Sequence, residues 1–294
     1  MYRGENRKIL MSKIFSTTRK VIIYTTLVIL ALVCCSLLYI VFVNSSRGKL
    51  EFSDGFAVLP SKYFISNMKG LFSNRTFQYY GNIGLALRNS LIIAFSTAVL
   101  ACYFSTWVAY GIHMYRFKLR NVAFTFILII MMIPSQVATV GFYKTIYKLK
   151  LTNNFLPLIL PAIASPITFF YIKQYMESVL PFEMIEAARV DGANEFRSFH
   201  QIVLPVIKPA LAVQFIFSFV ASWNNYFLPQ LLLTSSRKMT LPIFVARIRT
   251  GNDGYVDLAF VNSAILFAII PVTVVYLIFS KFIIKGLTLG AVKG

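Results

Sequence analysis

Long apolar runs separated by short polar stretches dominate the pattern of this chain. The uncharged, mostly apolar runs cover residues 21–43, 89–112, 121–143, 155–172, 209–233 and 258–280. An α-helix rises about 1.5 Å per residue, so about 20 residues cross the hydrocarbon core of a membrane. The run 155–172 is short and contains three prolines, so its bounds are the least defined. The pattern therefore predicts an all-α membrane protein with six transmembrane helices, because buried helices of a soluble protein need only about 10–14 apolar residues.

Composition and charge agree with this prediction. Hydrophobic residues make up 57% of the chain and charged residues 13%, against about 45–50% and 25% in soluble domains. The net charge of +19 comes from Lys and Arg spread over every connecting loop, and no nucleic-acid-binding motif accompanies them. Membrane lipid is therefore the expected partner of this surface, and nucleic acid is not.

The charges before the first run predict the orientation. Arg3, Arg7, Lys8, Lys13, Arg19 and Lys20 stand there against a single acid, Glu5. The positive-inside rule places such a segment in the cytoplasm, so residues 1–20 form a cytoplasmic amino-terminal segment. Six spans return the carboxyl terminus to the same side and leave loop 44–88 outside. A cleavable signal peptide is the alternative, but its apolar region would be 7–15 residues long.

The second run carries small residues at intervals of four: Ser90, Ala94, Ala98, Cys102 and Thr106. Small residues on one helical face let another helix approach closely, which favours packing in lipid. We expect a tight helix–helix contact along this face, within the chain or with a partner. Chance in a helix rich in small residues is the alternative.

The runs contain no Asp, Glu, Lys or Arg, although ion-driven carriers normally retain ionisable groups inside the membrane. The chain also lacks the G-x-x-x-x-G-K-[ST] loop that holds nucleotide phosphates. A transport function would therefore require a separate ATPase chain. Neither catalytic nor metal-ligating residues are expected in this chain, since its His, Cys and acidic residues show no metal or nucleophile spacing.

The polar segment 173–208 contains a predicted short helix over residues 181–193. Pro181 suits the first turn of a helix, where a backbone donor is not needed. Gly192 permits a left-handed backbone, which ends a helix and turns the chain. Ala187 and Ala188 add little bulk, so a partner's surface could come close. An ordinary amphipathic surface helix with a glycine cap explains these residues equally well.

The sequence Glu186–Ala187–Ala188, with Gly192 and the Ile202–Val203–Leu204–Pro205 stretch, fits the pattern E-A-A, three residues, G, nine residues, I-x-L-P. This pattern resembles the coupling loop in the membrane-spanning subunits of ATP-binding-cassette (ABC) importers. The sequence Asp191–Gly192–Ala193 and the carboxyl-terminal residues 290–294 resemble the corresponding segments of the carbohydrate-importing members. The resemblance covers about residues 85–294 and is close to the six-span subunit of the maltose-type permease.

The resemblance implies a type I ABC importer permease fold over residues 21–294, with a coupling loop at 173–208. It implies a bacterial plasma-membrane subunit that forms half of the translocation pathway for a sugar, such as an oligosaccharide. The implied partners are a second, homologous permease, two ATPase subunits that bind ATP and Mg, and an extracellular or periplasmic sugar-binding protein.

By the same analogy, the coupling residues are Glu186, Ala187, Ala188, Asp191, Gly192, Leu204 and Pro205. The candidate substrate-pathway residues are Gln136, Trp223, Asn224 and Asn225, which are polar or aromatic groups within apolar runs. Helix–helix hydrogen bonding is the alternative for these four. The family often has an acid at the position of Asn225, so a carboxylate has no role there in this chain.

Two other functions remain open. An ABC importer permease for a non-sugar solute would share this architecture, and an ion-coupled secondary transporter is disfavoured by the uncharged spans.

Overall fold

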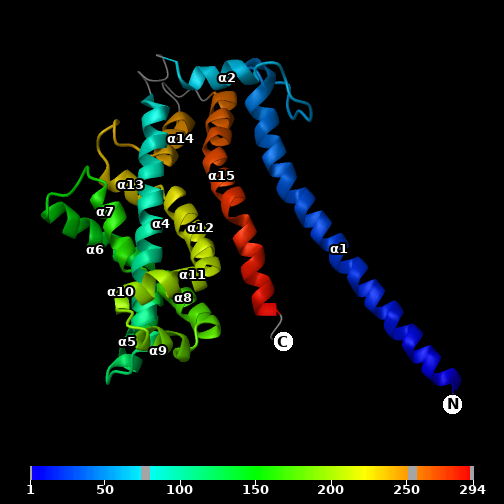
Figure 1. The fold of residues 1–294 in the computed structure, drawn as a ribbon. Helices are drawn as coiled ribbons and strands as arrows, with labels where there is room; N and C mark the ends of the chain where they lie inside the picture. Colours follow the sequence, from blue (N-terminus) through cyan, green and yellow to red (C-terminus); the bar gives the residue numbers. More distant parts are fainter. Residues whose placement is uncertain (1, 74–79, 251–256, 292–294) are drawn as a thin grey trace. The chain divides into compact units, whose positions relative to one another are not determined.

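The computed structural model describes residues 2–73, 80–250 and 257–291, and the side chains of 2–17, 135, 136 and 283–291 lie outside the described set. Within this part of the chain the secondary structure is helical, without strands. Figure 1 shows the helices and their labels. The chain divides into two compact units. The first comprises residues 1–70 and 257–266, and the second residues 71–256 and 267–294.

The first unit is built on the long helix α1 (Tyr2–Ser46). Its part Thr18–Ser46 is long and apolar enough to cross a membrane, and most of its side chains are exposed. The chain then forms η1 (Leu50–Phe52) and α2 (Phe64–Leu71). Asn67 of α2 donates hydrogen bonds of 2.9 Å to the Ser45 and Arg47 carbonyls. The start of loop 44–88 is thus tied to the end of α1.

The second unit is organised around α4 (Ile83–Met114), which packs against α8 (Pro166–Val179) and α12 (Lys208–Trp223). The five small residues spaced by four on α4 are all buried within the chain. Cys102 Sγ lies 3.8 Å from the Leu211 carbonyl oxygen of α12, and Ser90 Oγ accepts a hydrogen bond from Leu241 N. The predicted close-packed face is therefore confirmed, and its neighbours belong to this chain.

Three of the predicted runs are not continuous helices, including 155–172, which is interrupted at Ala164 and Ser165. Residues 121–143 divide into α5 (Arg120–Met131) and α6 (Ser135–Lys148), with Pro134 at the break. Residues 209–233 divide into α12 and α13 (Phe227–Leu232). Pro134 explains the break between α5 and α6, because proline lacks a backbone donor and clashes with the preceding turn. Apolar composition predicts burial in lipid but not the continuity of a helix.

Four helical stretches in the described residues are long and apolar enough to span a membrane: Thr18–Ser46, Ile83–Met114, Leu156–Val179 and Leu258–Phe282. The third combines α7 (Leu156–Ile159), η2 (Leu160–Ile163) and α8. The fourth lies in α15 (Leu258–Ala291). A fifth span is possible if α12 is counted with the segment Glu195–Val206, from which it turns by 80°. The count of six stays a prediction.

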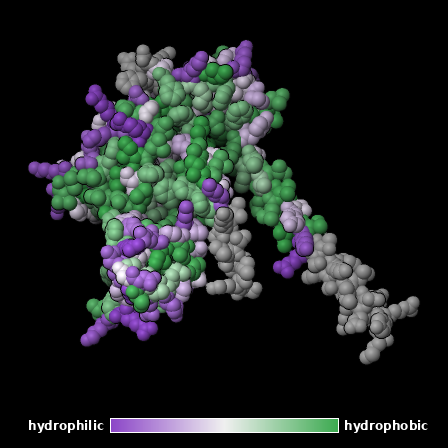
Figure 2. Space-filling model, viewed as in Figure 1, coloured by the Kyte–Doolittle hydropathy of each residue, from purple (hydrophilic) through white to green (hydrophobic). Residues whose placement is uncertain are grey.

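The remaining elements are α9 (Phe182–Val190), α10 (Glu195–Ser198), the π-helix η3 (Phe199–Val203), α11 (Leu204–Val206) and α14 (Leu241–Thr250). In Figure 2, apolar surface follows the long helices, and hydrophilic surface gathers at the end of the bundle where α9 and α10 lie. A polar end on an apolar bundle fits a protein that leaves the membrane at that point.

Candidate functional site

The candidate site is the connecting segment, residues 181–207, between α8 and α12. Its first helix, α9, begins directly after Pro181. At its other end, Gly192 N donates to the Arg189 carbonyl at 3.0 Å and Ala193 N to the Ala188 carbonyl at 2.9 Å. These two bonds form a Schellman cap, in which the first residue beyond the helix end adopts the left-handed conformation. Gly192 supplies it with a φ of +80°, which confirms the predicted backbone at this position.

One face of α9 is packed into the protein. Ile185 is 1% exposed and lies in a core cluster with residues of α4, α8 and η3, such as Tyr110, Met176 and Phe199. Ala188 is also buried. Its small side chain lets α9 lie close to the core, so Ala188 belongs to the buried face of this helix.

The opposite face of α9 is open. Glu186, Ala187, Asp191 and Gly192 are exposed there, and Val190 is 87% exposed. Further along the connecting segment, Leu204 is half-buried and Pro205 is exposed. Five of the seven predicted coupling residues are thus exposed.

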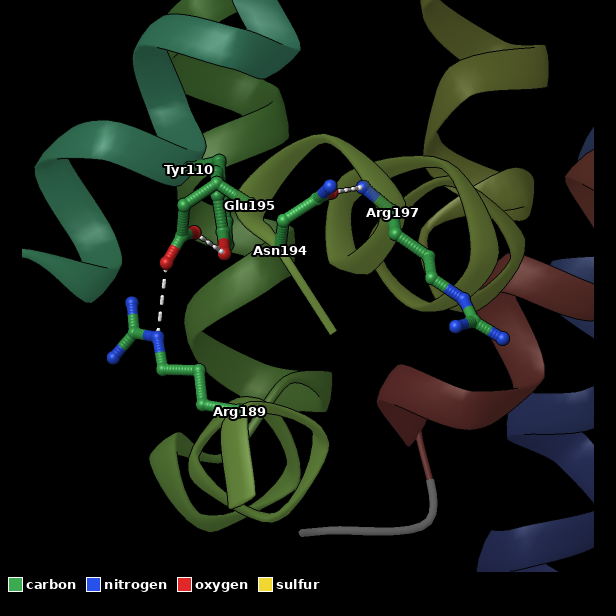
Figure 3. Close-up of polar contacts among 5 residues, drawn as sticks. All are labelled: Tyr110, Arg189, Asn194, Glu195 and Arg197. Atoms are coloured by element: carbon green, nitrogen blue, oxygen red, sulfur yellow. Dashed lines mark hydrogen bonds and ion pairs between the residues drawn. The ribbon is translucent and has the colours of Figure 1, made fainter. Parts of the chain in front are cut away.

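A carboxylate that the sequence did not single out links three helices. Glu195 Oε2 accepts a 2.6 Å hydrogen bond from the Tyr110 hydroxyl of α4, and Oε1 accepts a 2.9 Å bond from Arg189 Nε of α9. Figure 3 shows Glu195 of α10 between these two partners. We call these three residues the Glu195 junction. Tyr110 is 1% exposed, whereas the Arg189 and Glu195 side chains are 37% and 43% exposed.

The Glu195 junction holds the start of α10 against α4 and α9. Asn194 caps α10 by accepting a hydrogen bond from Arg197 N at 2.8 Å (Figure 3). The hydrogen bond to Glu195 raises the pKa of the Arg189 guanidinium, and its Cζ lies 5.3 Å from the centre of the Tyr115 ring. A cap residue followed by an acid is a weak local signal for α10. No sequence pattern could have paired Glu195 with Tyr110, because 85 residues separate them.

Aromatic packing attaches the rest of the connecting segment to α4. The rings of Trp107 and Phe199 stack with centroids 3.8 Å apart. Phe199 begins the π-helix η3, where Leu204 N donates to the Phe199 carbonyl five residues back. Pro205 lacks the amide that would bond Gln201 in a regular α-helix, so a wider turn before it loses little. The I-x-L-P motif therefore lies at a π-helical turn.

The candidate pathway residues are not all alike. Trp223 is 3% exposed and donates from Nε1 to the Ala268 carbonyl of α15 at 3.3 Å, which is the helix–helix hydrogen bond of the alternative interpretation. Asn224 and Asn225 are exposed at the end of α12, and Asn225 Oδ1 accepts from Leu228 N. The side chain of Gln136 lies outside the described residues.

The described residues contain no group of three or more His, Cys, Asp or Glu side chains placed to hold a metal ion. What the connecting segment presents outward is the exposed face of α9.

Comparison with known proteins places these features in a family. Residues 101–288 match the family model described as binding-protein-dependent transport system inner membrane component. The chain is 38% identical to the arabinooligosaccharides transport system permease protein AraQ of Bacillus subtilis (strain 168), over 70% of this chain and 72% of the relative. It is 32% identical to the sn-glycerol-3-phosphate transport system permease protein UgpE of Salmonella typhi, over 85% of this chain and 89% of the relative.

A solved structure shares the fold. It is described as a bacterial ABC transporter involved in the import of the acidic polysaccharide alginate, and its matching chain gives a TM-score of 0.76. The match covers 90% of this chain and 95% of that chain at 23% identity, so it shows an ABC importer permease fold. Since the family model matches more than half of the sequence, this chain belongs to the family of binding-protein-dependent transport system inner membrane components.

Proposed function

We propose that this chain is the membrane-spanning permease subunit of an ATP-driven, binding-protein-dependent importer of an oligosaccharide. The match to the arabinooligosaccharide permease AraQ, at 38% identity over 70% of the chain, carries this proposal. The solved transporter that shares this fold is described as importing alginate, which is also a carbohydrate polymer, and this supports the proposal. The chain would supply half of the pathway, and a second, homologous permease would supply the other half.

In this proposal, α9 is a coupling helix that receives an ATPase subunit. Its buried face is held to the core by Ile185 and Ala188, and its open face presents Glu186, Ala187 and Asp191. A helix attached on one side and exposed on the other can pass a rigid-body push to the spans around it. Two ATPase subunits, which bind ATP and Mg²⁺, would contact this helix and its counterpart in the second permease.

The pathway surface would include Asn224 and Asn225, whose exposed amides can form hydrogen bonds with sugar hydroxyls. Trp223 would hold the end of α12 against α15 through its bond to Ala268. An extracellular or periplasmic binding protein would deliver the sugar to the outer side of the pathway.

A phosphorylated small molecule is a second candidate substrate. The relative UgpE, named for sn-glycerol-3-phosphate, matches 85% of this chain. The transport assay should therefore include sn-glycerol-3-phosphate as a substrate. Neither AraQ nor UgpE is named as an ion-coupled carrier.

The transport proposal is tested by reconstitution. This chain alone, in liposomes, should hydrolyse no ATP and carry no sugar. Uptake of labelled arabinooligosaccharide should require the second permease, the ATPase and the binding protein encoded beside it, as well as ATP. Uptake of labelled sn-glycerol-3-phosphate, without uptake of the oligosaccharide, would favour the second candidate. Uptake by the chain alone under an ion gradient would contradict the importer proposal.

Orientation is tested by cysteine labelling. We expect both termini and α9 in the cytoplasm and loop 44–88 outside, because basic residues precede the first span. In a variant without Cys34, Cys35 and Cys102, a membrane-impermeant maleimide should label Asp54→Cys in intact cells. It should label Val190→Cys only after the cells are opened. Both positions are exposed in the structure, so the reverse result would overturn the topology rather than reflect burial.

A further inference from the structure

An apolar groove of about 280 Å³ runs between α4, α12 and α15, and Leu204 at the end of the connecting segment also lines it. Its apolar lining includes Val99 of α4, Leu211 and Phe215 of α12, and Phe279 and Phe282 of α15. The Phe215 ring lies 5.6 Å from Phe95 and 5.0 Å from Phe279, so aromatic contacts hold the groove together. These walls offer almost no hydrogen-bonding group, so they do not suit a sugar.

Two cations lie beside Phe282, which is part of the groove lining. Lys208 lines the groove and opens α12 at the 80° turn, and Lys281 lies at the end of the apolar stretch Leu258–Phe282. Their ammonium nitrogens lie 5.5 Å and 5.3 Å from the centre of the same Phe282 ring. Both side chains are exposed, and the groove lining includes no acidic residue.

The described side chains form ion pairs at Lys173–Glu177 and Arg189–Glu195, so the two lysines at the groove are not neutralised by an acid in this part of the chain. A shared aromatic ring attracts each ammonium group modestly, but the like charges repel one another. A single anion between them would relieve this repulsion. The position, where two apolar helices reach the polar end of the bundle, is where membranes hold their lipid headgroups.

We propose that this groove binds an anionic phospholipid, with an acyl chain along Leu211, Phe215 and Phe279 and the phosphate between Lys208 and Lys281. An apolar wall with two unneutralised cations beside it matches the two parts of such a lipid. Each lysine near a membrane surface contributes about a fivefold preference for anionic over zwitterionic lipid, so the pair contributes on the order of thirtyfold.

Photo-crosslinking in lipid nanodiscs tests this site. The full-length chain is reconstituted in phosphatidylcholine with a trace of phosphatidylglycerol that carries a diazirine on its acyl chain, or with the matched phosphatidylcholine probe. We expect the phosphatidylglycerol probe to label the peptides around Leu211–Phe215 and Phe279 about thirtyfold more than the zwitterionic probe.

Charge variants identify the phosphate site. Lys208→Gln with Lys281→Gln should remove this preference, whereas Lys208→Arg with Lys281→Arg should keep it. Lys144→Gln with Lys148→Gln removes two exposed lysines from α6, away from the groove, and should leave it unchanged. Circular dichroism verifies that each variant remains folded.

Three results would overturn the proposal. Equal labelling by both probes would show that the groove recognises no charge. Full competition by inorganic phosphate would show a free-anion site in place of a lipid site. A groove that crosslinks to another protein chain, and not to lipid, would be a helix-docking surface.

Discussion

Replacing Gly192 with valine is expected to lower ATP-driven uptake at least fivefold while the chain remains inserted and folded in the membrane. Gly192 has a φ of +80°, and a Cβ added there would meet nothing within 4 Å. The damage would therefore come from the backbone alone. A β-branched residue in this conformation costs on the order of 1–3 kcal/mol, which is about a 5- to 150-fold shift in a local equilibrium.

The expected consequence is a displaced end of α9. Without the left-handed residue, the bonds from Gly192 N and Ala193 N to the last turn of α9 are lost or strained. The spans keep their own backbone bonds in lipid, so expression and insertion should stay normal. The measurement is uptake of labelled substrate together with copurification of the ATPase in the reconstituted transporter.

Gly192→Asn is the matched control, because asparagine adopts the left-handed conformation more readily than other residues with a side chain. It should retain most of the uptake. If the valine variant transports normally with its ATPase bound, α9 is only a surface helix and the coupling proposal is wrong. If asparagine is as damaging as valine, the open surface at Gly192, and not its backbone, is what the partner requires.

Removing the Glu195 carboxylate is expected to uncouple ATP hydrolysis from transport. Glu195→Ala releases Arg189 and leaves the buried Tyr110 hydroxyl without its partner. A buried hydroxyl without a hydrogen bond costs about 1–3 kcal/mol. The attachment of α9 and α10 to α4 should weaken accordingly. We expect ATPase activity to continue while uptake per ATP hydrolysed falls severalfold.

A double-mutant cycle separates the Glu195–Tyr110 bond from general destabilisation. Tyr110→Phe removes the hydroxyl, so Glu195→Ala in that background leaves no unpaired buried group and should cost less than it does alone. Glu195→Gln, which can still accept from Tyr110 but loses its charge toward Arg189, should be intermediate. Additive effects in the cycle would show that Glu195 and Tyr110 do not act together in coupling.

The sequence alone determined the membrane class, the family and the position of the candidate coupling helix. Uncharged runs of about 20 residues indicate membrane helices, because they are long enough to cross the hydrocarbon core and place no charge in it. The turn after α9 was also predictable, because the backbone requirement at Gly192 is local and glycine satisfies it best. The E-A-A pattern stands in one short stretch of sequence, so no long-range information was needed to find it.

The tertiary structure decided which side chains face the core and which face outward. Ala187 and Ala188 are adjacent and are the same residue type, yet the first is exposed and the second is buried. The Glu195 junction joins residues 85 positions apart, and the bond from Trp223 to Ala268 joins residues 45 apart. The break in run 209–233 also appears only in the fold, whereas Pro134 is a local signal for the break in run 121–143. Periodicity and composition report the average environment of a segment, whereas a partner across the bundle depends on how helices pack, which local sequence does not encode.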